Sequence, residues 1–404
     1  MRYLLAGNIT GTNGAGRLAY SDDGTAFIPC TLNATPATAF HAVAASDTLC
    51  IAIELDSSNG DSYVWTSLDD GITFDYVADL LGIEVSSVVY ENGFFYAVGV
   101  NSGTSAGVIY RSANGTAWSL VHTATANSEY TEIIFAENRL VAVGGNLTNS
   151  TGLVSYSTNG TVWTTITPGS QQFEQIVFST VLGSYVAASV DFVDGAVTSL
   201  TVSDTGASWS PTALSQPEIN EARCMGVEAG LVLFSRKQSG QTPIISATLN
   251  GISVAATSLN VVWTSANTIN RVYQAGGVWF ILGRRTGLQP FYSAPSPVLN
   301  LGVYDLTLTA LTGLTGWTNT RDVVGFDTEP AVVISNVVIS NITETDALIT
   351  WDTDVPATTQ VQYGTTDEYG TETVLDTDLV EEHEVQLSGL LPGTVYHFEP
   401  LSVA

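Results

Sequence analysis

The chain has 404 residues, of which 45% are hydrophobic and only 12% are charged, so it can bury a large core beneath a mostly neutral polar surface. Thirty-nine acidic residues against eleven basic ones give a formal net charge of −28. This charge repels phosphate backbones and anionic lipid headgroups, which excludes nucleic acid and membranes as expected partners.

The N-terminus and the cysteines show no sign of export. The N-terminus reads MRYLLAG, whose apolar run is too short for a signal-peptide core, and no stretch reaches the length of a membrane span. Cys30, Cys50 and Cys224 are too few for a disulfide framework, and we interpret them as small buried hydrophobic residues. We therefore expect a chain that folds in the cytoplasm where it is made.

In chain order, the first strong feature is a phrase that recurs through most of the sequence. It reads YSDDGTAF from Tyr20, TSLDDGITF from Thr66, RSANGTAW from Arg111, YSTNGTVW from Tyr156, VSDTGASW from Val202 and ATLNGISV from Ala247. The glycines of these copies are spaced by 44 to 47 residues, and one further step leads to YSAPSPVL from Tyr292. About 45 residues is the size of one β-propeller blade, so the period predicts repeated blades.

Each copy of the phrase predicts a tight turn between two strands. A Ser or Thr hydroxyl can bond a turn amide, the following Asp or Asn bonds its own backbone, and Gly supplies a positive φ. An apolar side chain then returns to the core three residues after the glycine position. We expect these side chains to be structural pegs buried between sheets, with no ligand role: Phe27, Phe74, Trp118, Trp163 and Trp209, followed by Val254 and Leu299.

Two further phrases precede each turn and are typical of strands. The nearer one reads LLAG at Leu4, CIAIE at Cys50, FYAVG at Phe95, LVAVGG at Leu140, YVAAS at Tyr185, LVLFS at Leu231 and WFILG at Trp279. The earlier one reads VSSVVY at Val85, TEIIF at Thr131, EQIVF at Glu174 and NRVYQ at Asn270. Each unit therefore has four strands, and no window shows sustained helical periodicity.

The first unit begins at its second strand, and its missing strand is found far along the chain. Residues 321–326, RDVVGF, match the earlier phrase. We predict that Val323–Phe326 pairs with Leu4–Gly7, which closes the ring and removes exposed sheet edges. The sequence thus predicts an all-β chain whose residues 1–328 form a seven-bladed β-propeller closed by its N- and C-terminal strands.

The turn phrase resembles the Asp-box of sialidase-type (BNR) propellers, S-x-D-x-G-x-T-W. SLDDGITF from Ser67 fits the full form, with Phe in place of Trp, and the other clear copies are one residue shorter. The shorter form, YSTNGTVW after a VAVGG strand, is similar to propeller repeats of tailed-phage virion proteins. The resemblance covers about residues 1–328 and implies the fold more specifically than the function.

Residues 329–404 predict a small β-sandwich of alternating strands and turns. The segment resembles a fibronectin type III domain, a fold of the immunoglobulin-like kind, with Trp351 at its core tryptophan and Leu391–Tyr396 as its tyrosine corner. Pro356–Gly364 resembles the variant found in bacterial and phage multidomain proteins. Six strands are present and the seventh is missing, so we expect either a truncated chain or a neighbour that adds a strand at the open edge.

We predict no enzyme, no cofactor and no metal site. The arginine triad and FRIP segment of sialidases are missing, and Arg2 lies in RYLL, which reads as a strand. His41, His122, His383 and His397 fall in separate units, and we interpret the last two as surface strand histidines. Asp22–Asp23 and Asp69–Asp70 lie in loops too short for a calcium cage, which favours turn capping.

Basic residues gather at equivalent loops of neighbouring predicted blades, on the face opposite the turn phrases. They are Arg17, Arg236, Lys237, Arg284 and Arg285, five of the eleven basic residues. Together they would form a positive sector on an acidic protein, suited to phosphate or carboxylate groups. The alternative is that each orders its own loop by pairing with a nearby carboxylate, and this alternative carries more weight.

These features favour a non-enzymatic structural or host-recognition protein of a tailed-phage virion, in the tail or as a capsid appendage. The expected partners are other virion proteins and a host surface glycan, within a homo-oligomer or larger assembly. The particle would be extracellular, although the chain folds in the host cytoplasm. A secreted bacterial adhesin or carbohydrate-binding protein is the main alternative, and a glycan-cleaving enzyme is a further one, because thirty-nine acids can hide a catalytic carboxylate pair.

Overall fold

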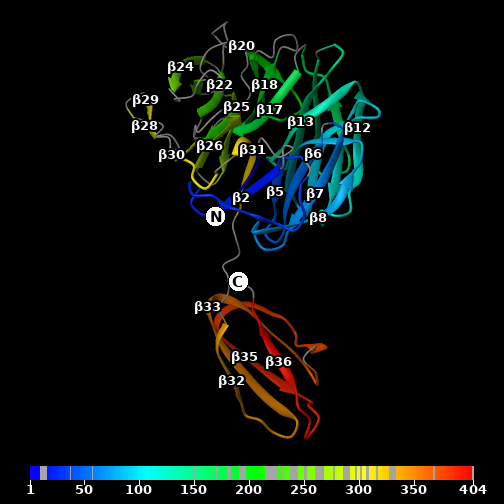
Figure 1. Cartoon of the computed structure of the whole chain (residues 1–404), viewed down its shortest axis with the longest axis vertical. Helices are drawn as coiled ribbons and strands as arrows, with labels where there is room; N and C mark the ends of the chain where they lie inside the picture. Colours follow the sequence, from blue (N-terminus) through cyan, green and yellow to red (C-terminus); the bar gives the residue numbers. More distant parts are fainter. Residues whose placement is uncertain are drawn as a thin grey trace. The chain divides into compact units, whose positions relative to one another are not determined.

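A computed structural model of the chain contains two compact units, Met1–Asp327 and Thr328–Ala404, which are described separately (Figure 1). Within the residues that the structure describes, every regular element is a β-strand. These residues are 1–9, 16–36, 38–56, 58–149, 151–169, 172–179, 183–190, 197–213, 225–228, 231–236, 244–249, 253–259, 268–275, 278–284, 292–295, 298–300, 303–305, 309–314, 317–326, 334–366 and 369–402.

Antiparallel sheets follow one another along the first unit. Four of them have four strands each: β9 (Ile83–Glu91), β10 (Phe94–Asn101), β11 (Ala106–Ser112) and β12 (Ser119–Ala126); β13 (Ser128–Ala136), β14 (Arg139–Asn146), β15 (Gly152–Ser157) and β16 (Thr164–Ile166); β17 (Gln172–Ser179), β18 (Ser184–Val190), β19 (Val197–Ser203) and β20 (Ser210–Ala213); β21 (Met225–Glu228), β22 (Leu231–Arg236), β23 (Ile244–Leu249) and β24 (Ser253–Leu259). Another contains β5 (Ala39–Ala45), β6 (Cys50–Asp56), β7 (Asp61–Ser67) and β8 (Thr73–Leu80), with β4 (Thr31–Leu32) parallel to β8.

The two ends of the first unit meet in one continuous sheet. Its order is β3 (Ile28–Pro29), β2 (Gly16–Ser21), β1 (Arg2–Ile9), β31 (Trp317–Phe326), β26 (Val278–Arg284), β27 (Tyr292–Pro295) and β30 (Thr309–Ala310), with β25 (Thr268–Ala275) beside β26. β28 (Val298–Asn300) and β29 (Val303–Asp305) form a separate hairpin. Leu4 pairs with Val324 and Leu5 with Val323, which confirms the predicted pairing of the two terminal segments (Figure 1).

The sheets succeed one another around a common axis. β31 lies against β5, β5 against β9, β9 against β13 and β13 against β17; β17 then lies against β21, β21 against β25, and β25 against β31 again. Each of these strands is the first of its sheet in the four-strand repeat, so the innermost strands form a closed ring. The first unit is therefore a β-propeller.

A β-bulge recurs at one place in the inner strands. The pairing of β9 with β10 shifts at Gly99, and that of β13 with β14 shifts beside Gly144. A Cβ on Gly99 would lie 1.9 Å from the Glu84 carbonyl oxygen, and one on Gly144 would lie 2.0 Å from that of Glu129. The glycine that ends phrases such as FYAVG is thus required by the close approach of the bulged neighbour.

Apolar clusters fill the spaces between adjacent sheets. Phe40, Trp65 and Phe74 are buried together with Leu4 and Leu18, which joins the sheet of β5–β8 to β1 and β2. Corresponding clusters lie between β5–β8 and β9–β12, and between the later described sheets. Packing between sheets, with alternate side chains on each face, explains why the strands read as nearly continuous hydrophobic runs.

The second unit is organised around one long strand, β33 (Asp346–Gly364). Its first half pairs with β32 (Ile334–Ser340) and β35 (Asp376–Ser388), and its second half pairs with β34 (Thr371–Glu372) and β36 (His397–Leu401). Both halves supply side chains to one core of Ile349, Trp351, Val361 and Leu387. Two small antiparallel sheets therefore share a single apolar interior.

Candidate functional site

The five basic residues of the predicted sector are only partly described. Arg17 lies near the start of β2 and Arg284 at the end of β26, while Lys237 and Arg285 lie outside the described residues. Pairing of Arg284 with Asn319, Asn319 with Asn8, and Asn8 with Gly16 places both arginines at one end of the continuous sheet. Three strand spacings separate their backbones by about 15 Å.

Arg236 is the last residue of β22, as Arg284 is the last residue of β26, and the two strands are the second strands of their four-strand repeats. The backbone thus brings the ends of β26 and β2 to the same edge, and it puts Arg236 at the corresponding end of another sheet. This end of the propeller is called the loop face here, and the opposite end, which carries the repeated Ser-Gly turns, is called the turn face.

Arg17 also has a local role in ordering the chain. Its guanidinium Nη1 donates a hydrogen bond to the carbonyl oxygen of Gly16 at 2.8 Å, and the residue is half-buried. This contact agrees in part with the alternative interpretation of the basic residues as loop-ordering groups, although the acceptor is a backbone carbonyl and not a carboxylate.

The turn face repeats one hydrogen-bond network. The Gly24 amide donates to Ser21 Oγ at 3.0 Å, and the Gly71, Gly115 and Gly160 amides donate to Ser67, Ser112 and Ser157 at 2.9 Å each. Asp23 Oδ1 accepts the amides of Thr25 and Ala26, and Asn114 and Asn159 do the same in later turns. All these glycines have φ between 67° and 80°, which confirms the predicted turn chemistry.

The two acidic turn residues are held in their charged form. Amide hydrogen bonds from Ala26 and Thr25 keep the pKa of Asp23 far below its usual range. Burial acts to raise the pKa of Asp69, but hydrogen bonds from Ser67 and Thr73 outweigh it and the net shift is downward. The carboxylates therefore serve as caps of the turns, as the sequence predicts for such short loops.

The aromatic pegs differ in how deeply they are buried. Phe27 and Phe74 are fully buried, at 3% and 0% exposure. Trp118, Trp163 and Trp209 are half-buried, because each indole N–H reaches back to the turn and donates to the carbonyl of Gly115, Gly160 or Gly206. Each tryptophan packs against a cluster between sheets, as predicted for a structural peg, but it is only partly buried there.

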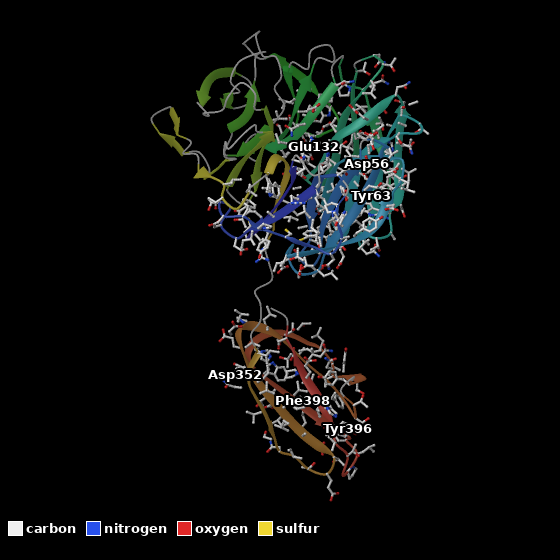
Figure 2. The ribbon with its side chains drawn as sticks, in the orientation of Figure 1. Asp56, Tyr63, Glu132, Asp352, Tyr396 and Phe398 are labelled. Carbon is white, nitrogen blue, oxygen red and sulfur yellow. The ribbon has the colours of Figure 1, made fainter. Side chains whose placement is uncertain are left out.

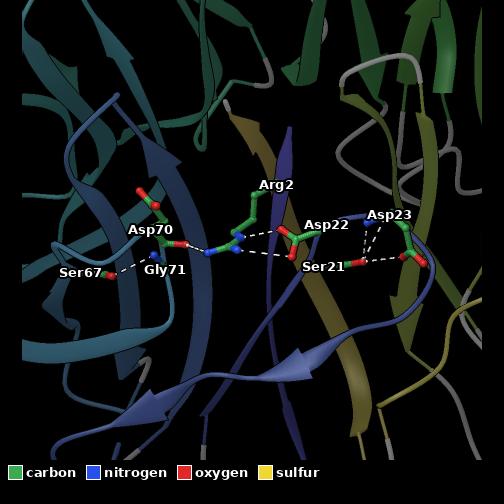
Figure 3. A network of polar contacts seen from close by, with 8 residues as sticks. Arg2, Ser21, Asp22, Asp23, Ser67, Asp70 and Gly71 are labelled. Carbon is green, nitrogen blue, oxygen red and sulfur yellow. Dashed lines mark hydrogen bonds and ion pairs between the residues drawn. The ribbon is translucent and has the colours of Figure 1, made fainter. Parts of the chain in front are cut away.

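Arg2, at the start of β1, joins the first turn to the turn of the next sheet (Figure 3). Its Nε donates to Asp22 Oδ1 at 2.7 Å, its Nη1 donates to the carbonyl of Asp70 in the next turn, and its guanidinium lies over Tyr20. Arg139 repeats this arrangement at the equivalent position of β14: it bonds the Thr205 carbonyl of the next turn and lies over Tyr156.

Buried carboxylates lock neighbouring inner strands together. Asp322 Oδ2 on β31 accepts the Val43 amide of β5 at 3.0 Å. Glu132 on β13, labelled in Figure 2, likewise accepts the Ile176 amide of β17 at its Oε2, at 2.9 Å. The two acids occupy equivalent places just after the bulge. Each carboxylate accepts a backbone N–H from the neighbouring strand, and this hydrogen bond compensates for its burial.

His41 lies at the bulge of β5, beside β31. Burial and the nearby charge of Arg321 lower the pKa of His41 to about 3, so the ring is neutral at physiological pH. Sequence reasoning missed this neighbourhood, because His41 and Arg321 are 280 positions apart in the chain.

One partly buried cluster has the composition of a nucleophile with a base. Ser155 Oγ lies 3.3 Å from His122 Nε2 and 2.7 Å from Thr165 Oγ1, and it also bonds the hydroxyl of Tyr130. Burial lowers the pKa of His122 and raises that of Tyr130 to about 12. Ser155 and Tyr130 are fully buried, so a substrate has no access and the cluster satisfies polar groups between two sheets.

His383 corrects the interpretation of the sandwich histidines. It is 3% exposed and stacks on Trp351, with ring centroids 5.0 Å apart. Thr353 and Thr359 hydroxyls lie 2.9 and 2.7 Å from its two ring nitrogens, and burial lowers its pKa. The prediction of a surface histidine is therefore wrong here, whereas His397 is exposed on β36.

Cys50 is buried and Cys30 is partly buried, both as free thiols. Burial raises the pKa of Cys50 to about 12 and that of Cys30 still further, so both behave as apolar residues, as expected. Cys224 lies outside the described residues. Across the described part of the chain, no group of three His, Cys, Asp or Glu forms a candidate metal site, and no helix could cross a membrane.

Neither a protein-family model nor a curated protein matches the sequence. Among solved structures, the chain is similar to the GH74 enzyme of Niastella koreensis at 12% identity and a TM-score of 0.50, covering 86% of this chain and 58% of that enzyme. It is also similar to the WD40 β-propeller domain of Doa1, at 15% identity and a TM-score of 0.45, covering 70% of this chain and 93% of that domain. The chain thus spans less than two thirds of the GH74 enzyme, and at 12% identity this likeness concerns the fold alone, which agrees with the β-propeller traced from the strand order.

Proposed function

We propose that the chain is a non-enzymatic binding protein of a tailed-phage virion, built from a seven-bladed β-propeller (residues 1–328) and a fibronectin type III-like domain (residues 329–404). It would serve in the tail or as a capsid appendage and contact host glycan or another virion protein. The resemblance of the turn phrase to phage propeller repeats supports the origin, and the neutral polar surface supports an extracellular particle.

The order of the inner strands supports seven blades. β31, β5, β9, β13, β17, β21 and β25 each begin one four-strand repeat and together close the ring. The single hydrogen-bonded pair that joins β26 to β31 links two neighbouring blades at their ends.

The tyrosine corner supports the fibronectin type III-like assignment. The Leu391 amide donates to the hydroxyl of Tyr396 (labelled in Figure 2) at 3.1 Å. Trp351 is 1% exposed in the core. A tyrosine whose hydroxyl bonds the backbone a few residues upstream, combined with a buried tryptophan, is typical of such sandwiches.

The observation that carries the recognition role is the contrast between the two faces of the propeller. On the turn face, the Ser, Asp and Asn side chains of four turns are engaged in capping bonds. On the loop face, the strand register brings Arg17 and Arg284 to the same edge. Variable loops on a rigid scaffold are the usual place for recognition, and arginine suits carboxylate and phosphate groups.

Charge reversal on the loop face tests this proposal. Arg284→Glu with Arg285→Glu should leave thermal unfolding unchanged and reduce adsorption to host cells, or incorporation into particles, about tenfold or more. Arg111→Glu is a control for charge reversal next to the turn face, scored for folding as well because Arg111 on β11 lies over the Phe94 ring. Normal folding with unchanged adsorption and incorporation would show that these arginines only order their loops.

A glycan-cleaving enzyme is the second candidate, because a chain with thirty-nine acidic residues can hold a catalytic carboxylate pair. The test is turnover on a panel of bacterial and plant glycans. Release of reducing ends by the purified chain, lost on substitution of a carboxylate pair, would replace the binding role with catalysis.

A further inference from the structure

The strands that flank β33 differ in how open their outer edges are. Within the described residues, β32, β34, β35 and β36 each pair with β33 alone. β34 has only two residues, which is too short to template another strand. An unpaired edge offers a row of N–H and C=O groups to an incoming strand, so each longer edge is a potential docking place.

Two of these edges are blocked by their own backbones. The Val361 N–H donates to Thr373 Oγ1 and its C=O accepts the Thr373 N–H, both on the side away from β36. The backbone of Pro400, the β36 partner of Val361, therefore points to the free edge, where it has no N–H to donate. On β32 the pairing shifts between Ser335 and Val338, and Asn336 has a φ of 51°. Prolines and bulges at such positions discourage strand pairing.

β35 has neither feature at its most regular part. The strand has thirteen residues and no proline, and its pairing runs without a shift from Asp346–Ser388 to Asp352–Glu382. Its outer edge is protected by charge instead: exposed acids occupy positions 376, 378, 381, 382 and 384. Like charges placed opposite one another discourage the pairing of two copies of this strand, but they favour a strand that carries basic residues.

The charge on this face has no counter-ion within the unit. Asp352 stands directly opposite Glu382 across the β33–β35 pair, with Glu384 next on the same face. Residues 328–404 hold fourteen acidic residues and no lysine or arginine. Leu379 and Val380 are 56% and 40% exposed beside these acids, so the edge combines negative charge with apolar surface.

We propose that the free edge of β35 binds an extended, basic segment of a partner polypeptide by strand addition. Backbone hydrogen bonds would continue the β32-β33-β35 sheet, lysine or arginine side chains would lie opposite Glu382 and Glu384, and apolar side chains on the other face would contact Leu379. This site lies on the second unit and does not depend on the recognition role of the propeller.

The test uses the full chain and two synthetic nine-residue peptides, one alternating lysine and valine and one alternating glutamate and valine. Calorimetric titration should detect the lysine peptide only, with weaker binding at higher salt. Glu382→Lys with Glu384→Lys should weaken that binding about tenfold or more and admit the glutamate peptide. Glu372→Lys with Glu399→Lys changes the net charge equally at exposed positions on β34 and β36, which pair with β33 and not with β35, and should change affinity less than threefold.

Hydrogen exchange distinguishes strand addition from a loose ionic association. The lysine peptide should slow the exchange of alternate amides between residues 382 and 388 about tenfold or more, because those amides gain hydrogen bonds. Binding that leaves these amides unprotected, or that both double variants weaken equally, would overturn the proposal. Absence of binding by the lysine peptide at millimolar concentration would overturn it as well.

Discussion

At the residue scale, the fifth turn departs from the earlier ones by a single side chain. Thr205 stands where the other short turns have Asp23, Asn114 or Asn159, and its hydroxyl accepts only the Ala207 amide, at 3.2 Å. Ser203 Oγ is buried and has no hydrogen-bond partner there. An unsatisfied buried hydroxyl lowers stability, so this turn is held less firmly than its counterparts.

Restoring the amide-accepting group should stabilise this turn. Thr205→Asn is expected to raise the free energy of unfolding of the propeller by about 1 kcal/mol, the typical net value of one added hydrogen bond. Denaturant titration followed by tryptophan fluorescence measures the change. Asn159→Thr is the reciprocal control and should lower stability by a similar amount; equal stability of both variants and the natural chain would contradict this reading.

Asp23 should make the first turn sensitive to acid. Its pKa is lowered in the folded chain by the Ala26 and Thr25 amides, so its contribution is complete above the ordinary aspartate pKa of about 4 and is lost as the pH falls toward the folded value. Asp23→Asn keeps the acceptor, as Asn114 does naturally, and should reduce the loss of stability below about pH 4. Melting temperatures between pH 7 and pH 3 test this; parallel curves for both proteins would refute it.

At the scale of the elements, the repeated strands and turns follow from the sequence because each depends on neighbouring residues. The Ser, Asp or Asn, and Gly of the turn phrase lie within four positions of one another, and their hydrogen bonds were therefore predictable. Gly99 in FYAVG and Gly144 in LVAVGG could also have predicted the β-bulge, because a glycine inside a strand often marks one. The sequence analysis did not use them in this way.

Contacts between distant strands could not be predicted in the same way. The equivalence of Arg2 and Arg139 as links to the next turn depends on which turn lies beside each strand in space. His383 reads as a surface residue because glutamates flank it, yet strand alternation turns it onto Trp351. The basic sector was predictable as a set of equivalent loops, but of its five residues the structure describes Arg17 in full and only the backbones of Arg236 and Arg284.

Trp163 should be a stabilising element between two sheets. Its ring lies 6.5 Å from that of Tyr96 and 6.1 Å from that of His122, and its N–H bonds the Gly160 carbonyl. Because Trp163 is half-buried, Trp163→Ala should lower the free energy of unfolding by about 3 kcal/mol, the low end of the range for a large aromatic side chain. Trp163→Phe keeps the packing and should cost less than half as much; equal losses would point to the indole hydrogen bond alone.

At the scale of the whole molecule, closure of the ring depends on the pairing of β1 with β31, which joins residues more than 300 positions apart. The phrase that marks β31 made this long-range contact predictable, because a half-unit at each end of the repeat leaves one arrangement that removes both edges.

The negative charge is distributed unevenly between the two units. Each unit carries a net charge of −14, but the first has about 327 residues and the second 77.

The second unit should therefore gain more stability from salt than the first. Its fourteen acids repel one another without a lysine or arginine to offset them, and like-charged neighbours such as Asp352 and Glu382 lie opposite each other across a strand pair. Raising the ionic strength from about 0.01 to 0.15 M shortens the screening length from about 30 to 8 Å and weakens this repulsion. Calorimetry should show two transitions, with the larger salt-dependent rise in the transition of the second unit, which is identified as the one that Trp351→Phe shifts. Glu382→Gln should reduce that rise, whereas Glu91→Gln in the propeller should leave it unchanged. If both transitions shift equally, or if Glu382→Gln has no effect, the repulsion between these acids does not limit the stability of the second unit.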